Sequence, residues 1–414
     1  MRILLLNQAF YPDVVSTAQH AADLAAALAD AGHDVTVLAS RRAYDDPSRL
    51  FPGIERWRGV NIVRVFSTAF GKSALWRRAI DFASFLLACI VRLAVLPHFD
   101  VVAAMTSPPL ISVLAALYVR IKGGALLSWI MDLNPDEAIA AGVLRRDSLA
   151  ARALGRLLQF SLDASSAVVV LDRFMRDRVV AKGVPASRVT VLPPWSHSAI
   201  VRYHEAGRAR FRAAHGLTGK FVVMYSGNHS PCHPLDAVLG AARALRRERD
   251  LAFVFIGGGS EFRKVAGFAD RHRLANILCL PYQPVESLAD SLSAADLHLV
   301  VMGDRFAGIV HPCKIYNVLA TGSPCLYIGP RRSHITEIAA QLPPDSVSCV
   351  AHGNATGVVR AIRSALSVGP RRSHAVTELA AAYSASRLLP QMVALVEDAG
   401  RAARECVPIT AVVS

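Results

Sequence analysis

The sequence lacks several features that would place it in particular classes of protein. No charge-free apolar run reaches the roughly eighteen residues of a membrane span. The beginning, MRILLLNQAF, lacks the long apolar segment and cleavage site of a signal peptide, and residues 1–6 are predicted to form a strand instead. The seven cysteines are odd in number, contain no CxxC, and fall partly in apolar strand segments. This usage favours a reducing, cytoplasmic location.

Acidic residues are few compared with basic ones. Lys and Arg number 46 against 32 Asp and Glu, which gives a net charge of +14 and a pI of 9.9. Such a balance favours nucleic acid, anionic lipid or phosphorylated substrates as partners. No basic run is interleaved with aromatic residues and no nucleic-acid motif is present, so we expect no nucleic acid. We expect phosphate-bearing ligands and an anionic membrane surface.

One segment comes close to a membrane helix. Residues 74–97, ALWRRAIDFASFLLACIVRLAVLP, are interrupted by Asp81 and Arg92, and an Arg pair follows Trp76 at one end. This is the composition of an amphipathic helix that lies on a membrane surface. The alternative is a long helix buried against its own domain. The clustering of Trp and Arg at one end favours membrane-surface contact.

Apolar strand segments alternate with helical patterns throughout the chain, which predicts parallel sheets covered on both faces. The first helical pattern, for example, places apolar residues at i, i+3, i+4 and i+7 from Ala21. A polar stretch at 193–219 separates two such series. The predicted strands are residues 3–6, 35–39, 61–66, 100–105, 125–130, 167–171 and 189–192, and then 221–226, 252–256, 277–280, 297–302, 324–328 and 347–351.

The fold class is therefore α/β, with two Rossmann-like domains. We expect domain boundaries at 1–200 and 201–385. The last helical pattern, at about 386–403, has no strand after it and could fold back across the first domain; the segment 386–414 is read as this helix and a tail. With 53% hydrophobic residues, the chain can bury substantial cores.

Residues 304–330, DRFAGIVHPCKIYNVLATGSPCLYIGP, are predicted to form a loop, a short helix and a buried strand. Pro312 fits the first helical position and Gly322 the C-terminal cap. Lys314 then lies in the first turn, where free N–H groups already provide partial positive charge. A bound phosphate would satisfy both the N–H groups and the lysine. The alternative is a solvated lysine lying over apolar surface.

Ligands of parallel sheets bind beyond the carboxyl ends of the strands. Gly257 to Ser260 follow a predicted strand and precede a helix, so this turn could hold a phosphate, or could be only a tight turn. Asp132 follows another strand and could position an acceptor hydroxyl or take its proton, although Asn134 to Glu137 also resemble a capped helix start.

Further candidates are His229, Cys232 and His233 in GNHSPCHP, and His311 and Cys313 in VHPC. Imidazole and thiolate groups can bind zinc, but no zinc-ligand spacing is present. Contacts of these residues with phosphate or sugar are therefore favoured over zinc ligation.

Together these segments resemble family 4 glycosyltransferases of the GT-B fold, in the branch that builds bacterial polysaccharides of the colanic acid and O-antigen type. The resemblance covers nearly the whole chain. Its segments, in family order, are FYPD…STAQHAADLAAALADAGHDVTVL, MDLNPDEAIAAGVL, VTVLPPW, YSGN…PLDAVLGAA, VFIGGGSE and CKIYNVLATGSP. It implies two Rossmann-like domains facing a cleft, the second holding a nucleotide sugar, with the C-terminal helix on the first.

The resemblance assigns roles residue by residue. Asp132 matches the acid near the acceptor, and Lys314 matches a lysine that contacts the donor diphosphate; these two are the predicted catalytic residues. Gly227 matches the glycine that opens the donor loop. The predicted donor-binding set is Gly227, Asn228, His233, Gly257, Gly259, His311, Lys314 and Asn317. No metal and no cofactor are implied.

Two departures from the family pattern stand out. Ile309 and Asn317 occupy the places of two glutamates that many members carry, and the basic residue usual after Gly227 is missing, with Cys232 near its place. The amide of Asn317 could still bond a ribose. His233, His311 or Asp304 could replace the lost sugar contact.

The sequence therefore predicts a glycosyltransferase that moves a sugar from a nucleotide donor, with UDP favoured, to a lipid-linked or polysaccharide acceptor, with retention of configuration. Its expected place is the inner face of the plasma membrane, as a peripheral protein. One alternative is a degenerate GT-B protein that binds a nucleotide sugar as partner of an active transferase. Another is a nucleotide-sugar epimerase.

Overall fold

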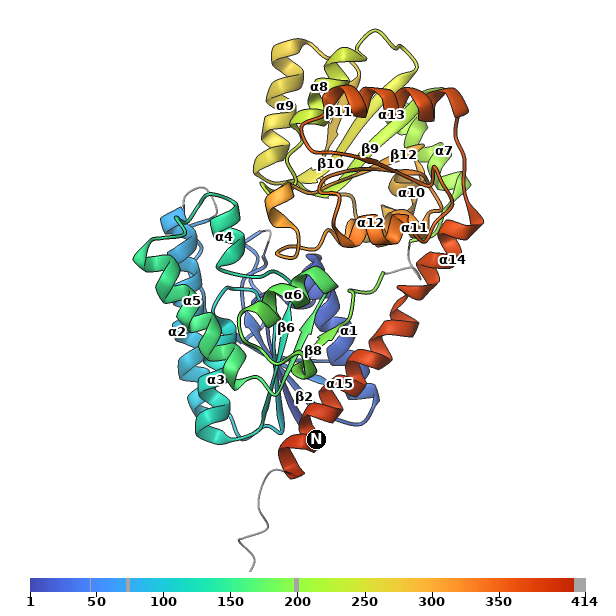
Figure 1. Ribbon diagram of the computed structural model, residues 1–414. Coiled ribbons are helices and arrows are strands. Elements are labelled where there is room, and N and C mark those ends of the chain that lie inside the picture. Colours follow the sequence, from blue (N-terminus) through green and yellow to red (C-terminus); the bar gives the residue numbers. More distant parts are fainter. Residues whose placement is uncertain (45, 72–74, 197–200, 406–414) are drawn as a thin grey trace, which may run out of the picture. The chain divides into compact units, whose positions relative to one another are not determined.

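The computed structural model describes residues 1–44, 46–71, 75–196 and 201–405 (Figure 1). The chain forms two compact units. The first comprises Met1–Pro193 with Leu388–Ser414, and the second comprises Pro194–Arg387. Each unit is an α/β domain built on one sheet, as the sequence predicts.

The first unit has a sheet in the order β3-β4-β2-β1-β5-β6-β7-β8, parallel except for β3. Its strands are β1 Arg2–Leu6, β2 Asp34–Ser40, β3 Ile54–Trp57, β4 Val60–Val65, β5 Val101–Ala104, β6 Ala125–Ile130, β7 Ala167–Val170 and β8 Val189–Val191. Its helices are α1 Ser16–Asp30, α2 Leu75–Val95, α3 Ile111–Lys122, α4 Asp136–Ala140, α5 Leu149–Ala164 and α6 Arg173–Ala181, with a 3-10 turn at Ala186–Arg188.

The second unit has a parallel sheet in the order β11-β10-β9-β12-β13-β14. Its strands are β9 Phe221–Asn228, β10 Leu251–Gly258, β11 Ile277–Leu280, β12 Leu297–Val301, β13 Cys325–Ile328 and β14 Val347–Val350. Its helices are α7 Glu205–Ala214, α8 Asp236–Ala244, α9 Ser260–His272, α10 Leu288–Ser293, α11 Lys314–Ala320, α12 His334–Ala339, α13 Ala355–Val368 and α14 His374–Ala382, with 3-10 turns at Val285–Ser287 and Asp304–Phe306.

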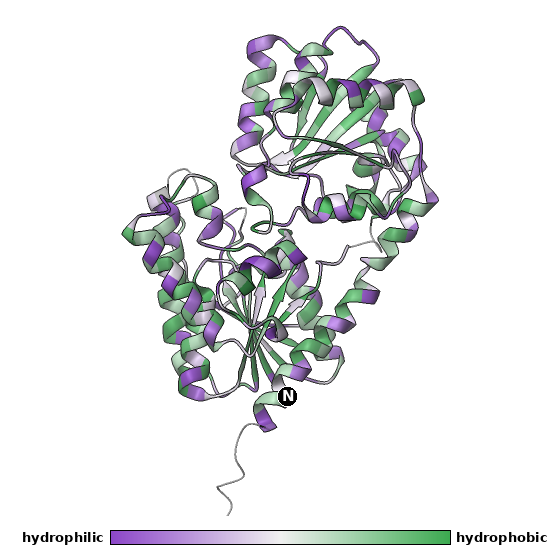
Figure 2. Cartoon of the chain, viewed as in Figure 1, coloured by the Kyte–Doolittle hydropathy of each residue, from purple (hydrophilic) through white to green (hydrophobic). Residues whose placement is uncertain are grey.

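The cores follow the predicted pattern. Most central strand residues are fully buried, and Ala21, Leu24, Ala25 and Leu28 of α1 have no exposed surface. Figure 2 shows the same division in each unit: the strands are apolar, and polar residues lie on the outer helices. Buried continuous strands of this kind are typical of parallel sheets covered on both faces.

The C-terminal helix α15, Ala385–Glu405, returns to the first unit from Leu388 onward, which confirms the predicted fold-back. Glu397 accepts a hydrogen bond from Nε2 of His33 at 2.9 Å, and Arg404 pairs with Asp100 at 2.9 Å. Gly400 lets the helix approach closely, because a Cβ there would lie 2.6 Å from the Met1 sulfur.

Three sequence predictions need correction. The antiparallel strand β3 was missed; it forms a hairpin with β4 through Arg58 and Gly59, both at positive φ. Pro312 is not the first helical residue, because α11 begins at Lys314 with Cys313 as its N-cap. Strand β4 covers Val60–Val65, one residue earlier than the predicted 61–66.

Within the described residues, no helix has the length and apolarity needed to cross a membrane.

Candidate functional site

The glycines predicted to approach a ligand come together in the second unit. Strands β9 and β10 pair in register to their carboxyl ends, so Gly227 lies opposite Gly257 and Asn228 opposite Gly258. Gly227, Gly257 and Gly259 all have positive φ, which side chains disfavour. A Cβ on Gly257 would lie 2.1 Å from the carbonyl oxygen of Gly227. The turn therefore requires glycine for both conformation and space.

Gly259→Ala gives a direct test of this turn. The added methyl group would lie 2.4 Å from the carbonyl oxygen of His229, and φ of +122° is strained for alanine. We expect the turn to shift and the affinity for nucleotide to fall at least about tenfold, a cost of ~1.4 kcal/mol. Titration calorimetry with UDP measures it. Gly267→Ala, on α9 with open space around it, is the matched control and should bind normally.

Lys314, the first residue of α11, reaches this turn. Its Nζ donates a hydrogen bond to the Tyr225 hydroxyl and lies 3.6 Å from the centre of that ring. The same nitrogen lies 3.7 Å from the point where a Cβ of Gly227 would be, so the lysine borders the donor loop. Burial lowers the pKa of Lys314 to about 7. An amine held partly desolvated beside a glycine turn is suited to an anionic ligand.

The sequence predicts phosphate or sugar contacts for His229, with zinc ligation less favoured, and it does not indicate the contact with the loop backbone that the structure shows. The side chain is fully buried, and its Nδ1–H donates to the carbonyl oxygen of Gly227 at 2.8 Å. Nε2 therefore carries a lone pair, and among the described residues it has no hydrogen-bond partner. Burial and the charge of Lys314 lower the pKa of His229 to about 4. A neutral imidazole thus fixes the loop backbone. The sequence signal for this role is the position of His229 directly after Gly227 and Asn228.

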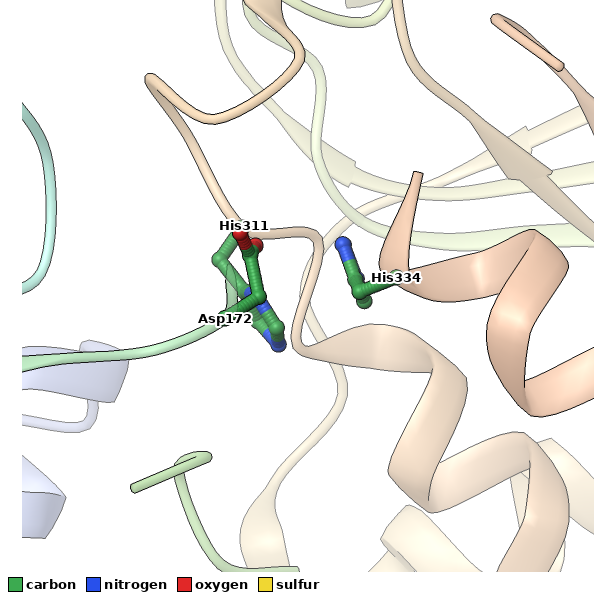
Figure 3. Close-up of side chains that lie close together, drawn as sticks. All are labelled: Asp172, His311 and His334. Carbon is green, nitrogen blue, oxygen red and sulfur yellow. The ribbon is translucent and has the colours of Figure 1, made fainter. Parts of the chain in front are cut away.

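The remaining predicted donor residues lie in the same unit. His233 donates from Nδ1 to the carbonyl oxygen of Val301 at 2.7 Å, and burial together with Lys314 lowers its pKa to about 3. The ring of His311 stacks on His334 with centroids 3.6 Å apart (Figure 3). Its Nε2 lies 2.7 Å from the Tyr316 hydroxyl. His233 and His311 each bond within the protein, and their roles in donor binding stay predictions.

Asn317 and Ile309 occupy the two positions where family members carry glutamates. Asn317 lies on α11, one turn after Lys314, and is partly exposed. Ile309 is 4% exposed and packs as an ordinary apolar residue. A polar sugar contact from position 309 is therefore lost in this chain.

In the first unit, Asp132 follows the carboxyl end of β6. Its side chain lines a cavity of about 150 Å³ whose other walls are mainly apolar. Desolvation, with a smaller contribution from the charge of Glu137, raises the pKa of Asp132 to about 7. A carboxyl group with a pKa near neutrality can accept or donate a proton at working pH. The competing interpretation is confirmed in part: helix α4 begins here with Asp136 and Glu137 in its first turn, but Pro135 occupies the N-cap position and no side chain caps it.

Asp132 and Lys314 affect stability with opposite pH dependence. The folded-state pKa of Asp132 lies above its ordinary 3.8, so the stability it contributes is complete below about pH 4 and is lost as pH rises to about 7. The folded-state pKa of Lys314 lies below its ordinary 10.5, so stability increases as pH rises from about 7 to 10.5. Groups that reduce stability near neutral pH are frequent at functional sites.

Comparison with known proteins agrees with this geometry. Residues 17–195 match the family described as Glycosyl transferase 4-like domain. The chain is 24% identical over 395 residues to the Escherichia coli (strain K12) protein WcaI, whose name describes a colanic acid biosynthesis glycosyl transferase; the match covers 88% of this chain and 92% of that protein. It is 26% identical over 239 residues to WbjE of Pseudomonas aeruginosa, named as a glycosyltransferase, covering 58% and 60% of the two chains.

Solved structures show the same fold. Sucrose-phosphate synthase from Thermosynechococcus elongatus aligns with a TM-score of 0.75 and 15% identity, covering 97% of this chain and 100% of that one. Anabaena Alr3699/HepE, solved in complex with UDP and glucose, aligns with a TM-score of 0.72 and 14% identity, covering 96% and 100%. The two parallel-sheet units and these likenesses show that the chain has the GT-B fold. The match over residues 17–195 and the two relatives named as glycosyltransferases support a family 4 bacterial glycosyltransferase.

Proposed function

We propose that this transferase moves a sugar from a UDP-sugar to a lipid-linked or polysaccharide acceptor in bacterial cell-envelope glycan synthesis, with retention of configuration. The observation that carries the donor side is the position of Lys314 beside the Gly227 loop. The name of WcaI supports polysaccharide synthesis, and the complex of HepE with UDP and glucose supports the nucleotide. The anomeric outcome follows the resemblance to family 4.

In the proposed reaction, the bond from the anomeric carbon to the UDP oxygen breaks and negative charge develops on the diphosphate. Lys314 and the backbone N–H groups of the glycine turn neutralise that charge. Because the pKa of Lys314 is about 7 in the free protein, binding of the diphosphate takes up a proton. His229 keeps the carbonyl of Gly227 turned inward and so holds the loop backbone in place.

On the acceptor side, Asp132 accepts a hydrogen bond from the reacting hydroxyl or takes its proton. Its raised pKa makes the carboxylate a stronger base than an ordinary aspartate. The chain retains no glutamate at 309, so sugar specificity depends on other groups of the second unit, Asn317 among them.

The direct experiment measures UDP release from UDP-glucose, UDP-galactose and UDP-N-acetylglucosamine, with and without a bacterial lipid extract. The proposal expects release with one donor and stimulation by lipid. Binding of UDP-sugar with no release under any condition would instead favour the degenerate partner protein. Conversion of the donor sugar to its epimer without acceptor would favour the epimerase.

We further propose that the first unit contacts the inner face of the plasma membrane through α2. This helix buries one apolar stripe, including Phe85 and Cys89, against the sheet. Its outer face is apolar as well: Val91 and Val95 are each 71% exposed. Arg77 and Arg78 are exposed at its beginning. An apolar outer stripe with cationic residues at one end fits an anionic lipid surface.

Reversing those two charges tests the membrane contact. Arg77→Glu with Arg78→Glu should lower binding to phosphatidylglycerol vesicles at least about tenfold, because each basic residue near the surface contributes about 1 kcal/mol. Co-sedimentation at low and high salt measures the effect. The control is Arg247→Glu with Arg249→Glu, two exposed arginines of the second unit. Equal losses in the two double variants would contradict the assignment to α2.

A further inference from the structure

The cavity beside Asp132 is a feature of the first unit that the proposed chemistry leaves unexplained. It lies between α3, α4, α5 and the carboxyl ends of β5 and β6, and has a volume of about 150 Å³. Helices α3 and α5, which wall it, pack against each other. Its apolar lining includes Leu110, Val113, Ile130, Leu133, Leu154 and Leu158.

The polar side chains around the cavity mostly bond to one another. Ser112 donates to Ser161 at 3.1 Å, and the hydroxyls of Ser128 and Ser165 lie 2.8 Å apart. The hydroxyl of Thr106 accepts a hydrogen bond from the backbone N–H of Asp132. The walls therefore offer little to a polar ligand except the carboxyl group of Asp132 itself.

The size and lining define the ligand chemistry. A mainly apolar cavity of about 150 Å³ has room for a hydrocarbon of about six carbons. Apolar walls that water can reach are unfavourable, and an apolar ligand would cover them. A cavity kept open next to a carboxyl group of raised pKa is therefore best explained by an apolar group that enters during function.

We propose that this cavity binds an aliphatic chain attached within a few bonds of the accepting hydroxyl, so that the acceptor is a glycolipid and not a free polysaccharide. The inference rests on the proposed function, in which the acceptor hydroxyl meets Asp132. Because the Asp132 carboxyl lines the cavity, atoms close to that hydroxyl lie at its apolar walls. Methylene groups that fill the cavity cover apolar wall surface that water would otherwise contact.

The helices that enclose the cavity also carry exposed apolar residues that could face a membrane. Leu117 and Ile121 of α3 and Leu157 of α5 are exposed, while other residues of these two helices line the cavity. Figure 1 shows α2, α3 and α5 side by side on one side of the sheet. A lipid held at the proposed membrane surface therefore meets the helix layer that encloses the cavity.

The test compares n-hexyl β-D-glucoside with methyl β-D-glucoside on the full-length protein by titration calorimetry, with the fluorescence of the buried cavity residue Trp129 as a second signal. The hexyl compound should bind at least about tenfold more tightly, since five further methylenes enter the cavity. Leu158→Phe and Val113→Phe each fill the cavity and should remove this difference. Leu157→Phe changes the preceding residue of α5, which is 38% exposed, and should preserve the difference between the two glucosides.

A cooperative melting transition near the wild-type temperature and a wild-type circular dichroism spectrum show that the first unit of each variant is folded, and the UDP response reports separately on the second unit. Equal binding of the two glucosides to the wild type, or undiminished hexyl binding in a Leu158→Phe protein that still responds to UDP, would overturn the inference. Failure of the proposed donor function looks different: the hexyl compound would bind while UDP produced no shift.

Discussion

Lys314→Ala should weaken UDP binding by about 10- to 100-fold, because a hydrogen bond between charged groups contributes roughly 1.5–3 kcal/mol. Transfer should fall further, by about 10² to 10³, since the leaving diphosphate gains charge in the transition state. Calorimetry and UDP release measure the two effects. In the wild type, UDP affinity should decrease as pH rises above about 7, where free Lys314 loses its proton. The variant should lack this dependence.

The same substitution should not reduce stability in the absence of nucleotide. Removal of a partly desolvated amine relieves an unfavourable burial, and the Tyr225 hydroxyl keeps its hydrogen bond to the carbonyl oxygen of Asn228 at 2.9 Å. The matched control is Lys264→Ala, an exposed lysine on α9, which should bind UDP normally. If Lys314→Ala binds UDP as tightly as the wild type, the lysine only lies over apolar surface and has no role in donor binding.

Asp132→Asn should lower the rate of sugar transfer by about 10² to 10⁴, the usual contribution of a positioned proton acceptor. The amide has nearly the same shape but cannot accept a proton. UDP affinity should remain unchanged, because the residues proposed to bind the nucleotide belong to the second unit. Transfer rates with lipid extract, together with UDP titration, separate these two outcomes.

The pH dependence gives a second readout for Asp132. The wild type loses the stability contributed by the protonated carboxyl between about pH 4 and 7, and Asp132→Asn should not. The two proteins should therefore differ in the slope of melting temperature against pH in this window. Asp147→Asn, an exposed aspartate of the same unit, serves as the control. A normal transfer rate in Asp132→Asn would exclude the residue as base.

The fold was largely predictable because its main signal is local. Apolar segments such as 125–130 and 277–280 coincide with β6 and β11 to the residue. β3 was missed since its four residues, IERW, include two adjacent charged side chains and form no apolar run, and they pair only with the neighbouring β4. The start of α11 was placed too early because proline at 312 fits a first helical position, whereas here it precedes the N-cap.

The candidate sites were predictable only in part. Glycines 227, 257 and 259 could be found because a strand followed by glycine and a helix is a sequence pattern. The register that brings Gly227 opposite Gly257 arises from pairing between strands about thirty residues apart, and spacing alone does not give it. The cavity beside Asp132 combines α3, α4 and α5 side chains, and no single segment indicates it.

The central claim, that the second unit holds a nucleotide-sugar donor, is tested most directly by the melting temperature of the purified protein with UDP, GDP, ADP and their sugars. A ligand at a hundred times its dissociation constant adds about 2.7 kcal/mol of stability, which is easily seen. We expect a shift with UDP and UDP-sugars that Lys314→Ala diminishes. No shift with any of the nucleotides would contradict the account.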